Sequence, residues 1–487
     1  MKSISELLEN SAANNPNKTA LIFDSTSYSY NEILKKSEMI SNYLQERIDE
    51  KNVVSILSEN SIDFIVAYFS ILKSGLIAHI IPPNISDSNL VKQIKETESQ
   101  LIFTSNKFKE KMKRTDLTDK SKFSLEDLSR NKDSKNDFFG NRFFDVSTII
   151  FTSGTTSKPK GVKLLHKNVL TSTLNIVNRL ELKNDNVEIN SLSLSHSFGL
   201  GCLHSNFMTG GTSIIFFNTI NLKDILEKSI KYSATGFVGV PNIFYRISDS
   251  FSKEFASITS LRYILTNTSP IKPKTVLKVI ELLPNTKFFT YYGLTEASRS
   301  TFLHFNSNIK KIESVGKPPN NVEIKIIDEK DNLLSSNEIG EICIKGEHVI
   351  KEYWNNPIAD SKIQDGWLKT GDTGYFDSDG FLFLKSRKDD LINVSGEKFS
   401  PEEVEEIINQ FPGITESAVI GISNENFGQI PIAFVAKKGE INSNDIIKHC
   451  QNKVERYKIP TKIIFLDSIP KTESGKIKRN EVKANFI

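Results

Sequence analysis

A run of hydroxyl and glycine residues follows the apolar segment Val146–Phe151 directly. Such a run gives a flexible backbone whose N–H groups can surround phosphate oxygens, and Lys158 and Lys160 add positive charge. The order of residues differs from that of a Walker-type loop. Composition alone favours a solvated loop between two strands, whereas the hydroxyls together with two lysines indicate a site for a polyanion. The candidate phosphate-binding residues are Thr152, Ser153, Gly154, Thr155, Thr156, Ser157 and Lys160.

Four further segments follow this loop in a fixed order. They read Tyr-Tyr-Gly-Leu-Thr-Glu at 291–296, Gly-Trp-Leu-Lys-Thr-Gly-Asp at 366–372, Ser-Arg-Lys-Asp-Asp at 386–390 and Pro-Lys-Thr-Glu-Ser-Gly-Lys at 470–476. Together with the loop they resemble the signature of the adenylate-forming superfamily, which includes acyl-CoA synthetases, AMP-dependent ligases, luciferases and the adenylation domains of peptide synthetases. The resemblance extends from Tyr30-Asn31-Glu32, which we expect in the first helix, to Lys476.

The chemistry implied by this resemblance is the attack of a carboxylate on the α-phosphorus of ATP, with release of pyrophosphate. Two anions must meet, so the site needs positive charge and N–H donors that are fixed in advance. The resemblance makes Lys476, Thr295 and Glu296 the catalytic residues. Lys476 would contact both the carboxylate and the α-phosphate, Thr295 would hydrogen-bond the α-phosphate, and Glu296 would be the protein ligand of Mg²⁺.

Nucleotide binding is implied for residues in three of the segments. Asp372 would accept hydrogen bonds from the ribose hydroxyls, and Arg387 would reach the same sugar or the phosphates. Tyr292 and Gly293 belong to the segment that ends at Glu296. One departure concerns the adenine, where relatives commonly carry Gly-Gly-Ala-Pro and this chain has Asn-Thr-Ser-Pro at 267–270, so that Asn267 is available to bond the adenine edge.

A change of domain orientation is also implied by the resemblance. Asp389, two residues after Arg387, stands at the hinge position, about which a small C-terminal domain turns once the adenylate has formed. The turn would bring residues 394–398 to the site, and Gly396 would let a pantetheine thiol pass close to the backbone.

The acid pocket is implied to follow the segment 195–199 and the strand near 237–241. His196, Phe198, Val238 and Gly239 are its candidate wall residues. Peptide-synthetase adenylation domains place an aspartate in the first of these segments to pair with an amino group, and none occurs here. An acid without an α-ammonium group, aromatic or aliphatic, is therefore favoured. A structural histidine and a plain buried strand are the alternative interpretations of these residues.

Bulk composition limits the class of protein. The chain has 487 residues, 38% of them hydrophobic and 25% charged, with a formal net charge of +3, so neither nucleic-acid binding nor membrane insertion is expected. Its three cysteines show no metal or disulfide spacing, and no run approaches the roughly 18 apolar residues of a spanning helix. No leader is expected at the N-terminus, and the predicted location is cytoplasmic.

Alternating apolar runs and helical patterns predict an α/β fold with parallel sheets. Strands are expected at 53–57, 77–81, 101–104, 189–194, 213–217, 236–240, 261–265 and 287–291, and helices at 62–73, 199–208 and 272–283. Residues 105–140 are expected to form a solvated excursion. After residue 322, strands at 323–327, 341–345 and 381–384 predict a small antiparallel element.

A second, smaller domain of α+β type is expected at the C-terminus. We predict a large AMP-binding domain over 1–388 and a small mobile domain over 389–487 that carries the lysine loop. Strands are expected at 417–422, 432–436 and 462–465, and a helix at 444–454. Another helix is expected to start with Ser400 as N-cap, Pro401 at its first position and Glu403 closing a capping box.

The function predicted from the sequence is that of an ATP-dependent carboxylic acid:thiol ligase that passes an acyl or aryl group to coenzyme A. The closest alternative acceptor is the phosphopantetheine of an acyl carrier protein, which would use the same catalytic residues. A non-catalytic relative that senses nucleotide or acyl ligand is the alternative of another class. Glu296, Asp372, Arg387 and Lys476 together argue against that alternative.

Overall fold

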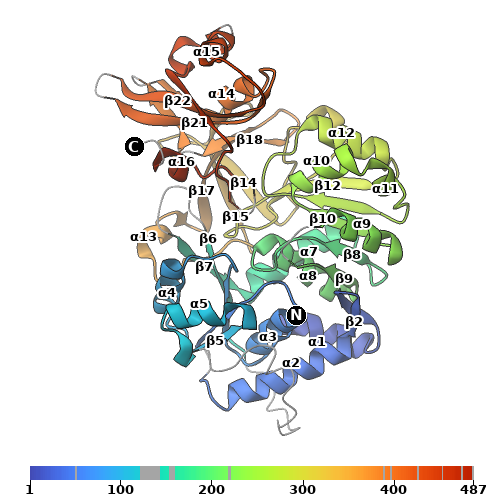
Figure 1. Cartoon of the computed structure of the whole chain (residues 1–487). Helices are drawn as coiled ribbons and strands as arrows, with labels where there is room; N and C mark the ends of the chain where they lie inside the picture. Colours follow the sequence, from blue (N-terminus) through green and yellow to red (C-terminus); the bar gives the residue numbers. More distant parts are fainter. Residues whose placement is uncertain are drawn as a thin grey trace.

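The structure is a computed structural model of the chain. It describes residues 1–49, 52–120, 143–152, 159–217, 221–387, 390–394, 397–424, 427–451, 453–472 and 475–484. Figure 1 shows the N-terminal elements at the bottom of the molecule and the C-terminal strands and helices at the top. The predicted α/β fold class, with parallel sheets, an antiparallel element and a small C-terminal unit, is confirmed.

The first sheet has five strands in the order β5-β3-β4-β6-β7. Strands β3 (Val53–Leu57) and β4 (Ile77–Ile81) are buried along their whole length, as expected for parallel strands covered on both faces. Helix α3 (Ile62–Lys73) is likewise buried at every position except Asp63. Strand β7 (Lys160–Leu165) runs antiparallel to β6 (Val146–Thr152), and this hairpin holds the predicted phosphate loop.

Helices α1 (Ser5–Asn14) and α2 (Tyr30–Gln45) pack with α3 beside this sheet. The expectation that residues 30–32 lie in the first helix is therefore wrong, because the mixed segment before them already forms α1. Helix α2 begins with a capping box, in which Ser29 and Glu32 each accept a hydrogen bond from the other's backbone N–H.

The segment expected to be a solvated excursion is partly packed. Its first part follows strand β5 (Leu101–Thr104) and contains the helical turn η1 (Asn106–Phe108) and helix α5 (Lys109–Arg114). Phe108 and Met112 are buried against the outer face of the first sheet, next to helix α4 (Asp87–Glu96). Two apolar residues one helical turn apart were enough to dock this otherwise charged helix.

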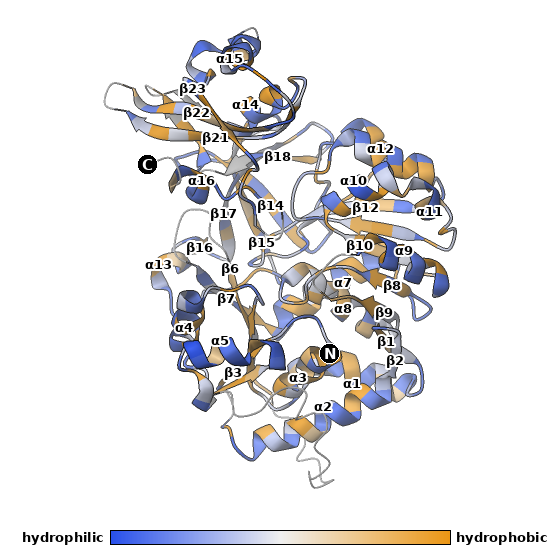
Figure 2. Ribbon diagram, in the orientation of Figure 1, coloured by the Kyte–Doolittle hydropathy of each residue, from blue (hydrophilic) through white to orange (hydrophobic). Residues whose placement is uncertain are grey.

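The second sheet has eight strands in the order β13-β12-β11-β10-β8-β9-β1-β2, and its six inner strands are parallel. The strands are β1 (Thr19–Phe23), β2 (Thr26–Ser29), β8 (Val187–Asn190), β9 (Thr212–Ile215), β10 (Gly236–Gly239), β11 (Tyr263–Thr266), β12 (Lys287–Tyr292) and β13 (Thr301–His304). Figure 2 shows hydrophobic residues along these strands, whereas α2 alternates hydrophobic and hydrophilic residues. Strand β8 ends four residues earlier than expected, because the side chain of Asn190 accepts from Leu192 N–H and donates to Gly199 C=O, which turns the chain out of the sheet.

Helices cover both large sheets. They are α7 (His166–Leu180), α8 (Ser197–Thr209), α9 (Leu222–Lys231), α10 (Pro241–Ser250), α11 (Ser252–Ala256) and α12 (Pro273–Leu282). Helices α7 and α8 pack against each other and lie between the two sheets in Figure 1. This pair separates the phosphate-loop hairpin from the strands of the second sheet.

An antiparallel sheet follows, as the sequence predicts. Its strands are β14 (Val322–Ile327), β15 (Gly340–Gly346), β16 (Ile363–Gln364), β17 (Trp367–Phe376) and β18 (Leu382–Arg387), with the short helix α13 (Pro357–Asp360) at its edge. Strand β18 belongs to this sheet, and the next strand, β19 (Ile392–Val394), belongs to another. The division of the chain at 388/389 remains a prediction, since residue 389 lies outside the described residues.

The C-terminal unit is a small sheet with helices. Its elements are β19, β20 (Glu397–Phe399), β21 (Ile414–Asn424), β22 (Gly428–Lys437), β23 (Lys462–Leu466), α14 (Pro401–Ile408), α15 (Ser443–Gln451) and α16 (Arg479–Ala484). Ser400 and Pro401 stand at the expected positions of α14, but the predicted capping box is wrong. Ser400 Oγ donates instead to Glu402, and Glu403 accepts from Lys458 Nζ at 2.7 Å.

Candidate active site

The ends of the predicted phosphate loop are held by the β6–β7 hairpin. Thr152 and Lys160 face each other across the two strands, and residues 153–157 between them lie outside the described part of the chain. Lys160 Nζ lies 5.8 Å from the centre of the Tyr353 ring. Backbone pairing of Val162 with Tyr353 joins this hairpin to the segment that precedes α13. The hairpin thus places a lysine beside an aromatic ring from a distant part of the chain.

The segment 291–296 leaves β12 in a tight turn. Leu294 and Ala297 exchange both backbone hydrogen bonds, at 3.1 and 3.2 Å. A side chain at Gly293 would meet the Arg299 backbone nitrogen at 2.5 Å, so only glycine fits there. Glu296 is half-buried, and its Oε1 accepts a hydrogen bond of 3.0 Å from the Tyr353 hydroxyl. Tyr353 therefore connects Lys160 with the predicted magnesium ligand.

Asp372 lies on β17 next to the same turn. Its Oδ2 accepts a hydrogen bond of 2.7 Å from the Tyr292 hydroxyl, and its N–H donates to Thr370 Oγ1 at 3.1 Å. Arg387 pairs with Asp372 across β17 and β18, so its backbone stands opposite the predicted ribose ligand. The structure thus brings segments 291–296, 366–372 and 386–387 together, as the sequence predicts.

The lysine loop is part of the C-terminal unit. Lys476 is exposed, and its backbone N–H donates to Thr472 Oγ1 at 3.1 Å, while its C=O accepts from Thr472 N–H at 2.8 Å. Gly475 has a left-handed φ of 84°, which closes this small loop. Its catalytic role remains a prediction, and the predicted hinge Asp389 and thiol-loop Gly396 lie outside the described residues.

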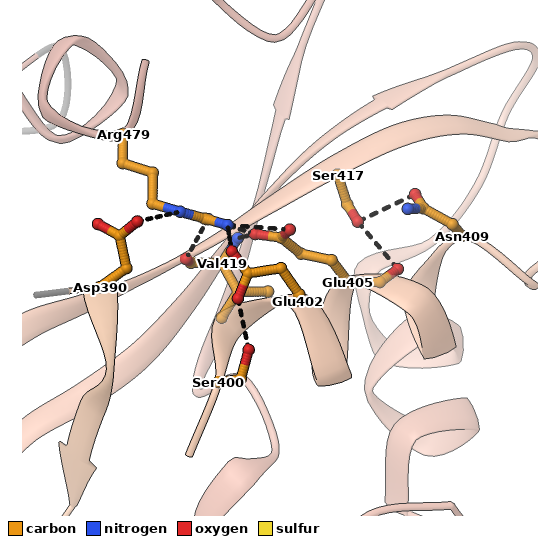
Figure 3. Close-up of polar contacts among 8 residues, drawn as sticks. All are labelled: Asp390, Ser400, Glu402, Glu405, Asn409, Ser417, Val419 and Arg479. Carbon is orange, nitrogen blue, oxygen red and sulfur yellow. Dashed lines mark hydrogen bonds and ion pairs between the residues drawn. The ribbon is translucent and has the colours of Figure 1, made fainter. Parts of the chain in front are cut away.

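A buried ion-pair cluster anchors the lysine loop to the rest of its unit. Figure 3 shows Arg479, three residues after Lys476, between the carboxylates of Glu402, Glu405 and Asp390. Its Nη2 donates to Glu402 at 2.7 Å and to Glu405 at 3.1 Å, and its Nε lies 3.8 Å from Asp390. Burial raises the pKa of Glu405, against the opposing effect of Arg479. The cluster joins α16, α14 and the residue after the predicted hinge.

Of the residues predicted to line the acid pocket, some are buried and one is exposed. Phe198 and Val238 are buried in one hydrophobic cluster that also contains Tyr291, whose ring meets Phe198 edge-on. A side chain added at Gly239 would lie 3.2 Å from Ser191 Oγ and 3.3 Å from the Ile243 side chain. His196 is exposed at the start of α8. A role of these four residues in acid binding remains a prediction.

A cavity of about 30 Å³ lies close by, between α7 and α8. The α8 residues that line it are Ser197, Leu200, Gly201 and His204, which share one face of that helix, and Thr295, Arg299 and His348 close it from other elements. Sequence reasoning identified Thr295 but missed the others. Tyr353 was missed as well, since nothing in the local sequence sets it apart from other buried tyrosines.

The segment Asn-Thr-Ser-Pro at 267–270, which replaces the Gly-Gly-Ala-Pro of relatives, has an unusual backbone conformation. Thr268 adopts a φ of 93°. Few residues other than glycine adopt that conformation, and β-branched residues hardly ever do. The backbone thus keeps a glycine-like turn although the glycines are replaced. An adenine contact by Asn267 remains a prediction.

Family models cover most of the chain. The model for the AMP-binding enzyme matches residues 8–354, and the model for the AMP-binding enzyme C-terminal domain matches residues 403–476. The chain belongs to the AMP-binding enzyme family. The predicted membership of the adenylate-forming superfamily is thereby confirmed, and with it, at the level of the family, an AMP-forming acid–thiol ligase.

Individual relatives of this AMP-binding enzyme are CoA ligases. It is 29% identical over 477 residues to the 2-succinylbenzoate–CoA ligase of Bacillus cereus, covering 96% of this chain and 95% of that protein. It is 28% identical over 495 residues to 4-coumarate–CoA ligase-like 6 of Arabidopsis thaliana, covering 96% and 87%. The o-succinylbenzoate CoA synthetase of Bacillus subtilis has the same fold at 26% identity. Its complex with the acyl-adenylate intermediate matches with a TM-score of 0.88, covering 98% of this chain and 97% of that one. Its complex with ATP and magnesium matches with a TM-score of 0.89, covering 98% of this chain and 99% of that one.

The cysteines, the possible metal ligands and the apolar helices of this AMP-binding enzyme bear on its chemistry. Cys202, Cys343 and Cys450 are free and buried. In the described part of the chain, no three His, Cys, Asp or Glu side chains gather to hold a metal ion, and no helix is long and apolar enough to cross a membrane. A lone carboxylate such as Glu296 fits Mg²⁺ that arrives with nucleotide phosphates, because Mg²⁺ is often held by one protein carboxylate together with substrate phosphates.

Proposed function

We propose that this protein is an ATP-dependent carboxylic acid:CoA ligase that forms an acyl- or aryl-adenylate and releases pyrophosphate. The observation that carries the proposal is the grouping of Lys160, Tyr353, Glu296, Tyr292 and Asp372 through the 2.7 Å and 3.0 Å hydrogen bonds described above. These side chains come from four segments far apart in the sequence. A family member with this grouping has the polar groups that adenylate formation requires.

Each side chain would act on a different part of the nucleotide. Asp372 would accept from the ribose hydroxyls, held in place by the Tyr292 hydroxyl, which donates to its Oδ2. Glu296 would bind Mg²⁺ while Tyr353 orients its second oxygen, and the ion would offset the negative charge of the phosphates. Lys160 and the loop it closes would hold the β- and γ-phosphates.

The second half-reaction would transfer the acyl group to a thiol. Coenzyme A is the acceptor in the names of the CoA ligases to which this chain is similar. An acyl carrier protein would use the same catalytic residues, and it remains the alternative acceptor. The names also cover two kinds of acid, since 4-coumarate has one carboxylate and 2-succinylbenzoate has two. A cytoplasmic location remains a prediction.

Carboxylate-dependent exchange of labelled pyrophosphate into ATP tests this proposal. Purified full-length protein is incubated with ATP, Mg²⁺ and a panel of aromatic and aliphatic acids, and exchange is expected with a subset of them only. Coenzyme A and a phosphopantetheinylated carrier protein are then offered separately to the adenylate. Absence of exchange with every acid would favour the non-catalytic alternative.

A further inference from the structure

Arg299 is a buried cation that makes no ion pair with a carboxylate in the described part of the chain. Its side chain is 2% exposed, and its guanidinium lies 5.4 Å from the centre of the Tyr291 ring. It donates to Ser298 Oγ at 2.8 Å, to Phe198 C=O at 3.3 Å and to Ser172 Oγ at 3.5 Å, all of them neutral acceptors. No described residue accepts a hydrogen bond from its Nε. Burying an ion without an opposite charge is costly, so such a residue calls for an explanation.

Gly201 and the backbone conformation of Arg299 allow the guanidinium to lie against α8. An added side chain at Gly201 of α8 would lie 2.3 Å from Arg299 Nη2, so the helix approaches the cation only because glycine stands there. Arg299 itself has a φ of 63°, a conformation that costs about 1 kcal/mol or more for a residue other than glycine. Strain of this kind clusters at ligand sites.

The buried acid Glu188 makes no ion pair with Arg299 in the residues that the structure describes. Glu188 accepts from Asn206 Nδ2 at 2.8 Å and from the Tyr263 hydroxyl at 2.5 Å. Burial raises the pKa of Glu188 to about 8, while the hydrogen bonds from Tyr263 and Asn206 and the charge of Arg299 act in the opposite direction. Burial also raises the pKa of the Cys202 thiol of α8, so this thiol is neutral.

The guanidinium lines the cavity between α7 and α8, together with Thr295 and His204. His204 is 1% exposed, and neither of its ring nitrogens has a hydrogen-bond partner among the residues that the structure describes. Burial lowers the pKa of His204 to about 3, so the ring is neutral and offers one N–H donor. The volume of about 30 Å³ corresponds to roughly two water molecules.

We propose that the acid activated by this chain carries a second carboxylate, and that Arg299 and His204 bind this carboxylate. This inference rests on the proposed acid activation. A guanidinium prefers a carboxylate over a neutral polar group because it can form two charge-assisted hydrogen bonds at once. Arg299 would then be a specificity-determining residue that accepts dicarboxylic acids and disfavours their neutral analogues.

Matched pairs of acids test the inference. Each dicarboxylic acid is compared with the monoamide in which the remote carboxylate is replaced, and pyrophosphate exchange gives kcat/KM for both. We expect the wild type to favour the dicarboxylic acid at least 100-fold, because a buried charged site left unpaired rejects the neutral analogue. Arg299→Met should lower kcat/KM for the dicarboxylic acid by roughly 30-fold to several thousand-fold and change that for the monoamide by less than about threefold.

Two further variants separate substrate recognition from loss of structure. Arg299→Lys keeps the charge and should recover part of the preference, and Gly201→Ala should weaken it by displacing the guanidinium without removing it. A wild type that favours the monoamides, or an Arg299→Met variant that loses activity equally with both acids, would overturn the inference while leaving acid activation intact. Failure of every acid would instead contradict the proposed function.

Discussion

At the scale of single residues, Lys476 has the most specific predicted role. Lys476 is exposed on a small loop of the C-terminal unit, where its N–H donates to Thr472 Oγ1. We expect Lys476→Ala to lower adenylation by about a hundredfold to a thousandfold, the scale for losing one oriented donor in a transition state. Transfer of the acyl group from a chemically prepared adenylate should be almost unchanged. Pyrophosphate exchange and thioester formation measure the two half-reactions separately.

Lys478→Ala is the matched control for Lys476. Lys478 lies two residues away and is also exposed, and its Nζ pairs with Glu481 at 3.0 Å within the C-terminal unit. Both half-reactions should keep their rates in this variant. Equal loss of both half-reactions in Lys476→Ala would argue against a lysine that acts in adenylation alone.

Individual residues also show where sequence reasoning ends. Tyr292, Glu296 and Asp372 stand in sequence motifs whose residue types and order predict that they meet. The hydrogen bond from the Tyr292 hydroxyl to Asp372 joins two of them, whereas Glu296 accepts from Tyr353, which belongs to none of these motifs. Arg299 has no such motif. Its burial depends on Gly201, which lies about a hundred residues earlier in the chain, and no local pattern links the two.

At the scale of elements, Arg479 supplies the ionic contacts that hold α16, whose Val482 is also buried against β21 and β22. Arg479 joins it to Glu402 and Glu405 of α14 and to Asp390, and Glu405 also accepts from the Val419 N–H of β21. We expect Arg479→Met to destabilise the C-terminal unit by about 3–5 kcal/mol, because it leaves buried carboxylates unpaired. Adenylation should fall more than transfer, since the helix that follows Lys476 loses its anchor. Urea unfolding and the two half-reaction assays measure both effects.

Arg456→Met provides the comparison for Arg479. Arg456 is an exposed arginine of the same unit, and its replacement should change the free energy of unfolding by no more than about 0.5 kcal/mol. A small effect in both variants would mean that the carboxylates around Arg479 are protonated or hydrated. A loss of stability without any difference between the half-reactions would leave α16 as a structural anchor alone.

Most elements were predictable because their patterns are strong. The continuous apolar runs of β3 and β4 and the uniformly buried α3 are found within the expected bounds. Predictions of local hydrogen bonds were wrong where a side chain instead contacts a residue distant in the sequence. Glu403 pairs with Lys458, fifty-five residues away, instead of closing the capping box of α14. Helix α1 was not predicted because polar residues interrupt its apolar pattern. Its few apolar residues lie on one face, which packs on α2 and α3.

At the scale of the whole molecule, the chain changes from one sheet to another between β18 and β19. The two family models leave a gap from 354 to 403 that contains this change. Composition and length predicted two units, since 487 residues exceed what one core accommodates. The orientation of the units could not be predicted, because it depends on contacts between surfaces that no sequence pattern records.

Buried histidines should make the whole molecule sensitive to acid. Burial lowers the pKa of His79 and His204 to about 3 and that of His166 and His348 to about 4. In the unfolded chain a histidine has a pKa of about 6.5, so between about pH 6.5 and 4 unfolding takes up protons at these side chains. Stability is therefore complete above pH 6.5 and falls as the pH decreases, by up to about 1.4 kcal/mol per pH unit for each histidine.

Glu188 should act in the opposite direction and so provides an internal control. Its pKa of about 8 lies above the value of roughly 4.5 expected for the unfolded chain, so its contribution to stability is complete below pH 4.5 and is lost as the pH rises to 8. Urea unfolding at several pH values from 4.5 to 8.5 should show a maximum of stability between these two effects. In Glu188→Gln the fall toward acid should steepen and the fall toward pH 8 should disappear. A free energy of unfolding that stays constant between pH 6.5 and 5 would contradict the neutral, buried state of the four histidines.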